Sequence, residues 1–155
     1  MTLWTAARRA RILVALSVLS ALALTACGSS SLSDKQLRTS AGRICTTANR
    51  RTARIPSPAR PADATAYLSR GVAALTLELT QLRALHAPSD LAGDYRVAVA
   101  QAAAELTALR SAIKGLKTGD DPVVEIKTLQ HRLAPLEARA GDAWRSVDVD
   151  ACVSR

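Results

Sequence analysis

Apolar residues recur at spacings of three and four positions along most of the chain, from Leu37 to Val147. This spacing places them on one face of an α-helix, whereas a half-buried strand would alternate apolar and polar residues. No segment alternates in that way, and the sequence contains no run rich in Val, Ile and Thr of the kind that forms strands. The pattern therefore restricts the chain to helical folds, in which each helix turns one apolar face toward a shared core.

Proline, glycine and capping residues divide the periodic pattern into helical segments. Ser33 and Asp34 can cap the first segment, and Gly119 follows the third, where a helix C-cap is expected. Three prolines between positions 56 and 61 cannot continue a helix and favour an extended link. The expected helices cover residues 34–54, 63–87, 90–118 and 122–147, and the tail at 148–152 is expected to be a loop. Pro135 predicts a kink or break near residues 131–133.

Four amphipathic helices joined by short links predict an all-α fold, an up-and-down antiparallel four-helix bundle over residues 34–155. The chain of 155 residues fits one such domain. The first helix is the shortest and the most polar of the four. Trp144 is expected to wedge into the core near the C-terminal end, and Tyr67 and Tyr95 are expected at the edge of the core.

The first 26 residues have the character of an export signal. Three arginines and no acid precede an apolar run over residues 12–24. A helix that spans a bilayer needs about 20 apolar residues, so this short run is typical of a secretory signal peptide. The alternative is a buried N-terminal helix. Arg8 and Arg9 leave both the general and the twin-arginine export route open.

The end of this run, Leu24-Thr25-Ala26-Cys27, resembles the lipobox of bacterial lipoproteins at all four positions. The resemblance implies cleavage between Ala26 and Cys27 and a covalent diacylglyceryl lipid on the Cys27 thiol, with no other cofactor. It also implies that the mature chain is anchored in the membrane, on the outer face of the cytoplasmic membrane. Residues 27–33 then form a flexible tether. An ordinary signal peptide with a cysteine near its cleavage site is the alternative.

Two cysteines remain once Cys27 is assigned to lipid. The implied compartment permits disulfides, so Cys45 and Cys152 are expected to form the one available pair. This bond would join the first mature helix to the C-terminal tail. The alternative is a redox-active pair. The spacing is unlike Cys-x-x-Cys, and neither cysteine has an adjacent His or Lys that would lower its pKa.

Over its full length the chain resembles the small helical lipoproteins of high-GC Gram-positive bacteria. The resemblance rests on the lipobox, on Cys45 in the first helix, on the proline-rich link after Ile55, and on Cys152 shortly after Trp144. The helices are rich in Leu, Ala and Arg, and 17 arginines against 4 lysines fit a GC-rich genome. The resemblance implies a location in the cell envelope and a helical fold. It does not indicate what the protein does.

Positive charge is concentrated close to the expected anchor. Seven basic residues and one acid lie between Asp34 and Arg60, whereas 11 basic and 12 acidic residues follow. A cation near an anionic membrane surface gains about 1 kcal/mol, so contact with lipid headgroups is one interpretation of this stretch. A solvated helix face that keeps the protein soluble is the other. The residues expected to contact the membrane surface are Lys35, Arg38, Arg43, Arg50, Arg51 and Arg54.

Motifs that carry chemistry are missing from the sequence. It lacks Phe and has 3% aromatic residues, which argues against nucleic-acid binding by base stacking. It contains no Gly-x-Ser-x-Gly, no glycine-rich phosphate loop and no Glu followed three residues later by His. No carboxylate pair stands out from ordinary helix-surface charge. We therefore expect no enzymatic activity and no metal site.

The expected function is that of a non-enzymatic binding or scaffold module of the cell envelope. Its partner would be an envelope protein or an amphiphilic ligand, in addition to the membrane itself. The alternative is a metal-binding or enzymatic helical bundle that uses His86 and His131, which could be neighbours in an antiparallel bundle. A third interpretation is a structural spacer with only an anchor and a compact head.

Overall fold

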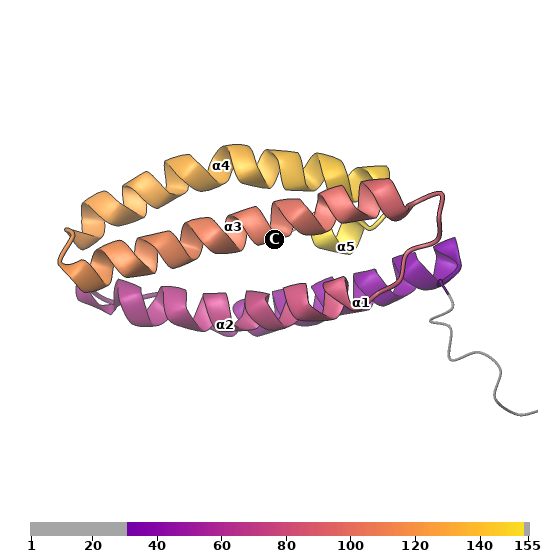
Figure 1. Cartoon of the computed structure of the whole chain (residues 1–155). Helices are drawn as coiled ribbons and strands as arrows, with labels where there is room; N and C mark the ends of the chain where they lie inside the picture. Colours follow the sequence, from indigo (N-terminus) through magenta and orange to yellow (C-terminus); the bar gives the residue numbers. More distant parts are fainter. Residues whose placement is uncertain (1–30, 154–155) are drawn as a thin grey trace, which may run out of the picture. The chain divides into compact units, whose positions relative to one another are not determined.

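The computed structural model describes residues 31–153. The expected signal peptide, the cleavage site at Ala26 and Cys27, and residues 28–30 of the expected tether lie outside the described residues. Within residues 31–153 every regular element is helical, as the periodicity predicts (Figure 1). The elements are α1 (Asp34–Thr52), the 3-10 turn η1 (Pro61–Asp63), α2 (Ala64–Arg83), α3 (Ala92–Thr118), α4 (Pro122–Ser146) and α5 (Asp150–Val153).

The helix boundaries follow from local side-chain chemistry. Ser33 caps α1 in a reciprocal arrangement: its hydroxyl accepts from the Gln36 backbone N–H, and the Gln36 side chain accepts from the Ser33 N–H. Gly119 ends α3 in the left-handed region, at φ 103°. The Asp121 carboxylate then accepts from two backbone N–H groups at the start of α4, where Pro122 takes the first position.

Of the kink or break predicted near residues 131–133, the break does not occur, because α4 continues through Pro135 from Pro122 to Ser146. Pro135 is exposed, so water can solvate the helix carbonyl group that loses its donor. Leu129 and Ala140, which lie on either side of the proline, are both buried, Leu129 in the smaller core cluster and Ala140 in the larger one, so both halves of α4 are packed against the rest of the fold. The helix arches over α3 in Figure 1 rather than breaking.

The expected loop at residues 148–152 is also wrong, since residues 150–153 form the short helix α5. Asp148 has a φ of 55° and reverses the chain after α4; an aspartate tolerates this region better than most residues. The Cys152 N–H then donates to the Val149 carbonyl group at 3.0 Å. The tail thereby folds back onto α1 instead of trailing away.

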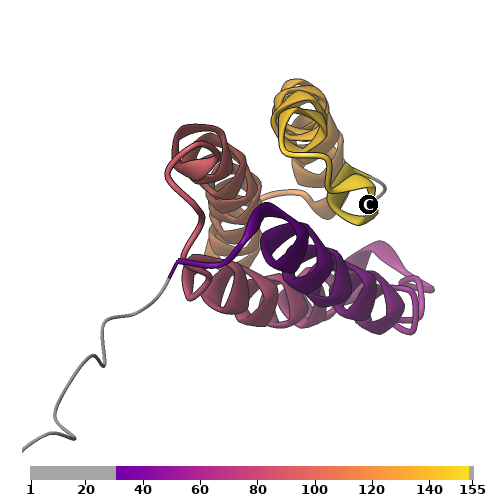
Figure 2. The ribbon, with the colours of Figure 1, turned by 90° about the vertical axis from the view of Figure 1, so that its right-hand side faces the viewer.

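Neighbouring helices pack in sequence order, α1 on α2, α2 on α3, and α3 on α4 (Figures 1 and 2). Two short elements also connect α4 to the first two helices. At one end α5 contacts both α1 and α4, and at the other end η1 contacts both α2 and α4. The two ends of the molecule are therefore closed by different elements.

The larger core cluster surrounds Trp144, whose side chain is 0% exposed, as expected for a core wedge. Tyr95 packs edge-on against it, with ring centroids 6.0 Å apart. Tyr95 is buried rather than at the core edge, and its hydroxyl donates to the Leu82 carbonyl oxygen at 2.7 Å. Burial raises the pKa of the Tyr95 phenol, so it remains a neutral donor at physiological pH.

A smaller cluster lies toward the end where α3 leads into α4. Its buried members are Leu68, Ala112 and Leu129, and Tyr67 is partly buried against them, at the core edge as expected. No residue of α1 belongs to this cluster, so only α2, α3 and α4 build it. This end of the fold therefore has a thinner core than the end that contains Trp144.

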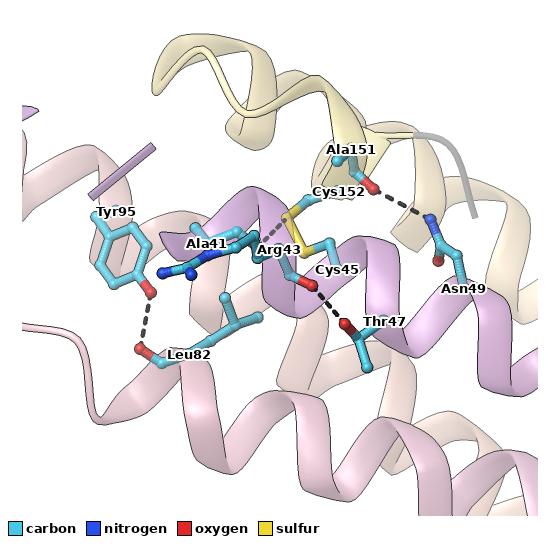
Figure 3. Close-up of a disulfide and its surroundings, with 9 residues drawn as sticks. All are labelled: Ala41, Arg43, Cys45, Thr47, Asn49, Leu82, Tyr95, Ala151 and Cys152. Atoms are coloured by element: carbon cyan, nitrogen blue, oxygen red, sulfur yellow. Dashed lines mark hydrogen bonds between the residues drawn. A yellow bond between two sulfur atoms is a disulfide. The ribbon is translucent and has the colours of Figure 1, made fainter. Parts of the chain in front are cut away.

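The Cys45–Cys152 disulfide joins α1 to α5, which confirms the predicted pairing (Figure 3). The two Cα atoms lie 5.1 Å apart, within the usual range for a disulfide. The Asn49 side-chain amide donates to the Ala151 carbonyl oxygen at 3.1 Å, one helical turn along from the bond. Both cysteines are buried, at 0% and 2% exposure, so the bond is part of the core.

The folded chain begins earlier than the expected boundary at Asp34. The Leu32 backbone N–H donates to the His86 carbonyl oxygen at 2.8 Å. The Leu32 side chain is partly buried against the larger core cluster. Two residues of the expected tether are therefore held by the fold, which shortens the segment between Cys27 and the domain.

Replacing both cysteines with alanine should destabilise the domain, because the bond closes a loop of 107 positions in the unfolded chain. We expect a loss of about 2–4 kcal/mol in the free energy of unfolding, measured by urea denaturation. Reduction of the unsubstituted protein should give a similar loss. An unchanged denaturation midpoint in the double variant would show that α1 is held without the bond.

Candidate functional site

The outer face of α1 carries the candidate site. The buried residues of this helix lie on its other side and are Leu37, Ala41, Cys45 and Ala48. Arg43 and Arg50 are exposed and seven positions apart, which places them on one face about 10 Å apart along the axis. The disulfide fixes this orientation, since Cys45 can face Cys152 only if Arg43 and Arg50 face away from the core.

Most of the cations on this face form no ion pair with another described residue. Within residues 31–153, Arg38 is the one member of the predicted membrane-contact set that forms an ion pair. The other five are exposed and without an ion pair in the described chain: Lys35, Arg43, Arg50, Arg51 and Arg54. An external anion could therefore bind these charges without breaking an ion pair within residues 31–153.

A groove of about 410 Å³ runs along this face beside α5. Its lining residues are Arg38, Thr39, Gly42, Arg43, Thr46, Thr47, Arg50 and Ala151. The Thr47 hydroxyl donates to the Arg43 carbonyl oxygen within the helix at 2.8 Å. Thr39 and Thr46 are exposed and seven positions apart, in the same register as Arg43 and Arg50. Their hydroxyl groups add hydrogen-bonding capacity between the guanidinium groups.

These threonines were not among the predicted contact residues, because that prediction rested on positive charge alone. The signal that would have found them is the seven-residue spacing that they share with Arg43 and Arg50. Ala151 was missed for a different reason. Residues 148–152 were expected to form a loop, so no residue there was expected to border the basic face.

Arg38 differs from the other predicted contact residues because it is engaged inside the fold. Its Nε donates to the Val147 carbonyl oxygen at 3.1 Å, and its guanidinium lies 3.3 Å from the Asp148 carboxylate. Its side chain is 37% exposed. Arg38 therefore links α1 to the turn between α4 and α5, and it neutralises one of the two acids, Asp148 and Asp150, at this edge of the basic face.

The two histidines of the metal-binding alternative lie on different elements. His86 is exposed in the connection between α2 and α3, and His131 is exposed on α4. Among the described residues there is no group of three or more His, Cys, Asp and Glu side chains that could hold a metal ion. The arrangement of residues 31–153 therefore lends this alternative no support.

Two glutamates depart from the expectation of ordinary helix-surface charge. Glu78 on α2 is 3% exposed and Glu105 on α3 is 6% exposed. Each continues the apolar spacing of its helix, Glu78 between Leu75 and Leu82, and Glu105 between Ala102 and Leu109. This spacing could have predicted that both glutamates are buried, because a residue on the apolar face of a helix faces the core whatever its side chain.

No helix within residues 31–153 is both long and apolar enough to cross a membrane. A comparison with family models, with curated proteins and with solved structures finds no match for this chain. What the chain does must therefore be inferred from the geometry and charge of its own residues.

Replacing Arg38 with alanine should loosen the C-terminal tail. It removes a hydrogen bond to Val147 and a half-exposed ion pair, so we expect a loss of about 1 kcal/mol in stability. Amide hydrogen exchange over residues 147–153 should accelerate. Arg43→Ala on the same helix is the matched control and should change stability by less than about 0.5 kcal/mol. Equal exchange in the two variants would contradict a structural role for Arg38.

Proposed function

We propose that this chain is a non-enzymatic, lipid-anchored module of the cell envelope that lies with α1 against the outer face of the cytoplasmic membrane. One observation carries the proposal: Lys35, Arg43, Arg50, Arg51 and Arg54 are exposed cations without an ion pair in the described chain, all in or just after the first helix that follows the expected lipidation site. The diacylglyceryl group on Cys27 holds the chain at the membrane. The cations on α1 then set how the domain is oriented there.

The tether length supports this division of roles. Leu32 is the first of the described residues whose backbone is hydrogen-bonded to a distant part of the fold. The five residues from Cys27 to Leu32 extend at most about 17 Å. The first turn of α1 therefore stays close to the lipid surface, and its cations can come within the electrostatic screening length of about 8–10 Å.

The energies also separate anchoring from orientation. Two acyl chains give stable attachment without help from the protein. Each cation close to an anionic surface adds about 1 kcal/mol, so five of them contribute several kcal/mol toward one orientation. Loss of the basic face would therefore leave the protein on the membrane but free to reorient.

The folded head is proposed to be an up-and-down bundle of the four long helices. The packing of α1 on α2, α2 on α3 and α3 on α4 supports this arrangement. With α1 turned toward lipid, the outer surfaces of α3 and α4 face away from the membrane. Those surfaces are where the head would bind an envelope protein as a scaffold.

The lipid anchor is tested in the full chain in the cells that export it. Mass spectrometry of the membrane-extracted protein should show an N-terminus at Cys27 that carries a diacylglyceryl group. The variant Cys27→Ala should leave the membrane fraction or remain unprocessed, because the acylated thiol is gone. A protein that stays membrane-bound and processed after this substitution would overturn the anchor.

Electrostatic docking is tested on the chain that starts at Gly28, without lipid, using vesicles with and without phosphatidylglycerol. Binding should require the anionic lipid and weaken with added salt. Replacing Arg43 and Arg50 with glutamate should weaken binding more than about 100-fold, because two attractive charges become repulsive.

The matched control replaces Arg132 and Arg139 with glutamate. These arginines are also exposed and seven positions apart, but on α4, and the change in net charge is the same. This control should retain most of the binding. Equal losses in the two double variants would mean that net charge alone governs binding and that α1 has no special role.

A further inference from the structure

A second groove lies at the end of the fold where α3 leads into α4, on the left in Figure 1. It has a volume of about 450 Å³ and runs between the proline-rich link, the start of α2 and the start of α4. Its walls are mainly apolar and include Pro58, Pro61, Tyr67, Val123 and Ile126. The proposed function gives this groove no role.

The groove follows from the proline-rich link. The prolines at 56, 58 and 61 keep residues 56–60 out of any helix, so extended chain and the single turn η1 occupy the place beside α4. A 3-10 turn is too short to cover the apolar face at the start of α4. Tyr67 and Ile126 are consequently only partly buried, and Val123 is 62% exposed.

The charged residues that line the groove are both cations. Arg60 and Lys127 are the charged residues that line it. The Arg60 guanidinium is already paired with Asp63 at 3.2 Å, and the Asp121 carboxylate is occupied by the backbone N–H groups at the start of α4. Lys127 is exposed and has no ion pair with any described residue. An apolar groove is therefore bordered by one uncompensated positive charge.

We propose that this groove binds a free fatty acid, with its acyl chain along Tyr67, Val123 and Ile126 and its carboxylate at Lys127. A single unpaired cation matches the single negative charge of a fatty acid. The volume lies in the lower half of the range of about 300–1,000 Å³ for small-ligand sites, which suits one acyl chain better than two. Burial of the chain supplies the affinity, and the ammonium group selects the anionic headgroup.

The lipid expected on Cys27 is a poor candidate for this groove. The chain enters the fold at Leu32, beside His86 after the end of α2, whereas the groove lies at the start of α2. These points are about 30 Å apart along the 20 residues of α2. The five residues from Cys27 to Leu32 reach at most about 17 Å, so an acyl chain on Cys27 would have to leave the bilayer and cover the remaining distance. Its acyl chains are also ester-linked and carry no carboxylate that could pair with Lys127. A diffusible amphiphile is therefore the occupant that the geometry favours.

The test uses the full chain in its membranes and a photoreactive probe, hexadecanoic acid with a diazirine in its acyl chain. After irradiation, labelled peptides are mapped by mass spectrometry. We expect label on residues 58–67 and 122–130, and competition by excess unlabelled fatty acid. A neutral alcohol probe of the same length should label these peptides several-fold less.

Val123 and Val124 provide a matched pair of variants. They are 62% and 63% exposed and share the first turn of α4, but Val123 lines the groove and Val124 does not. Val123→Asp should lower labelling of the groove peptides about tenfold, which corresponds to a loss of about 1.4 kcal/mol in the binding free energy of the probe. Val124→Asp should leave it unchanged. Thermal unfolding should be the same in both variants, since neither residue is buried.

Lys127 is tested separately from the apolar wall. Lys127→Glu should abolish the preference for the acid over the alcohol, whereas Lys114→Glu on α3 should keep it. The proposal is overturned if label spreads evenly over the helices, if the two valine variants lose label equally, or if Lys127→Glu keeps the preference. None of these readouts depends on α1 docking, so failure here is distinguishable from failure of the proposed function.

Discussion

The bond between Cys45 and Cys152 is the constraint on which the arrangement of α1 depends. The apolar residues that α1 buries are small apart from Leu37, so its hydrophobic contribution is modest. The disulfide adds a covalent link to the end of the chain, and Arg38 and Asn49 add hydrogen bonds to the same region. A polar first helix can therefore keep a fixed orientation without a wide apolar face.

This constraint also determines which face of α1 is exposed. Because Cys45 faces the core, Arg43 and Arg50 face solvent; Thr46 lies between them along the helix, and Thr39 lies one turn before Arg43. Long basic side chains on a loosely held helix would point in many directions. Holding the helix by its opposite side turns them into one positively charged surface, which is what contact with a planar anionic membrane requires.

The sequence predicted features that local chemistry controls. Ser33, Gly119 and Pro122 each act within a few residues of their own position, and the structure has them as predicted. The apolar periodicity predicted the helices for a similar reason, because it records which face of each helix is buried. The disulfide was predictable because, with Cys27 assigned to lipid, only one pair remained.

The errors arose where tertiary contacts override local preference. Pro135 favours a break, but the core contacts on either side keep α4 continuous. The tail at 148–152 has no helical pattern, yet the bond to α1 brings it into the turn of α5. The apolar groove was missed because it depends on where the proline link runs relative to α4, which neither segment reveals alone.

The proposed orientation places α1 as the part of the domain that lies on the membrane. The most direct measurement places a nitroxide label at position 46, on the exposed face of α1, in the lipid-anchored full chain on anionic vesicles. Nickel chelated to lipid headgroups should relax this label strongly, and the effect should fall at about 1 M salt, where screening shortens to about 3 Å. A label at position 132 on α4 should be relaxed much less. Equal relaxation at the two positions would contradict the account, since the domain would then have no preferred face toward the membrane.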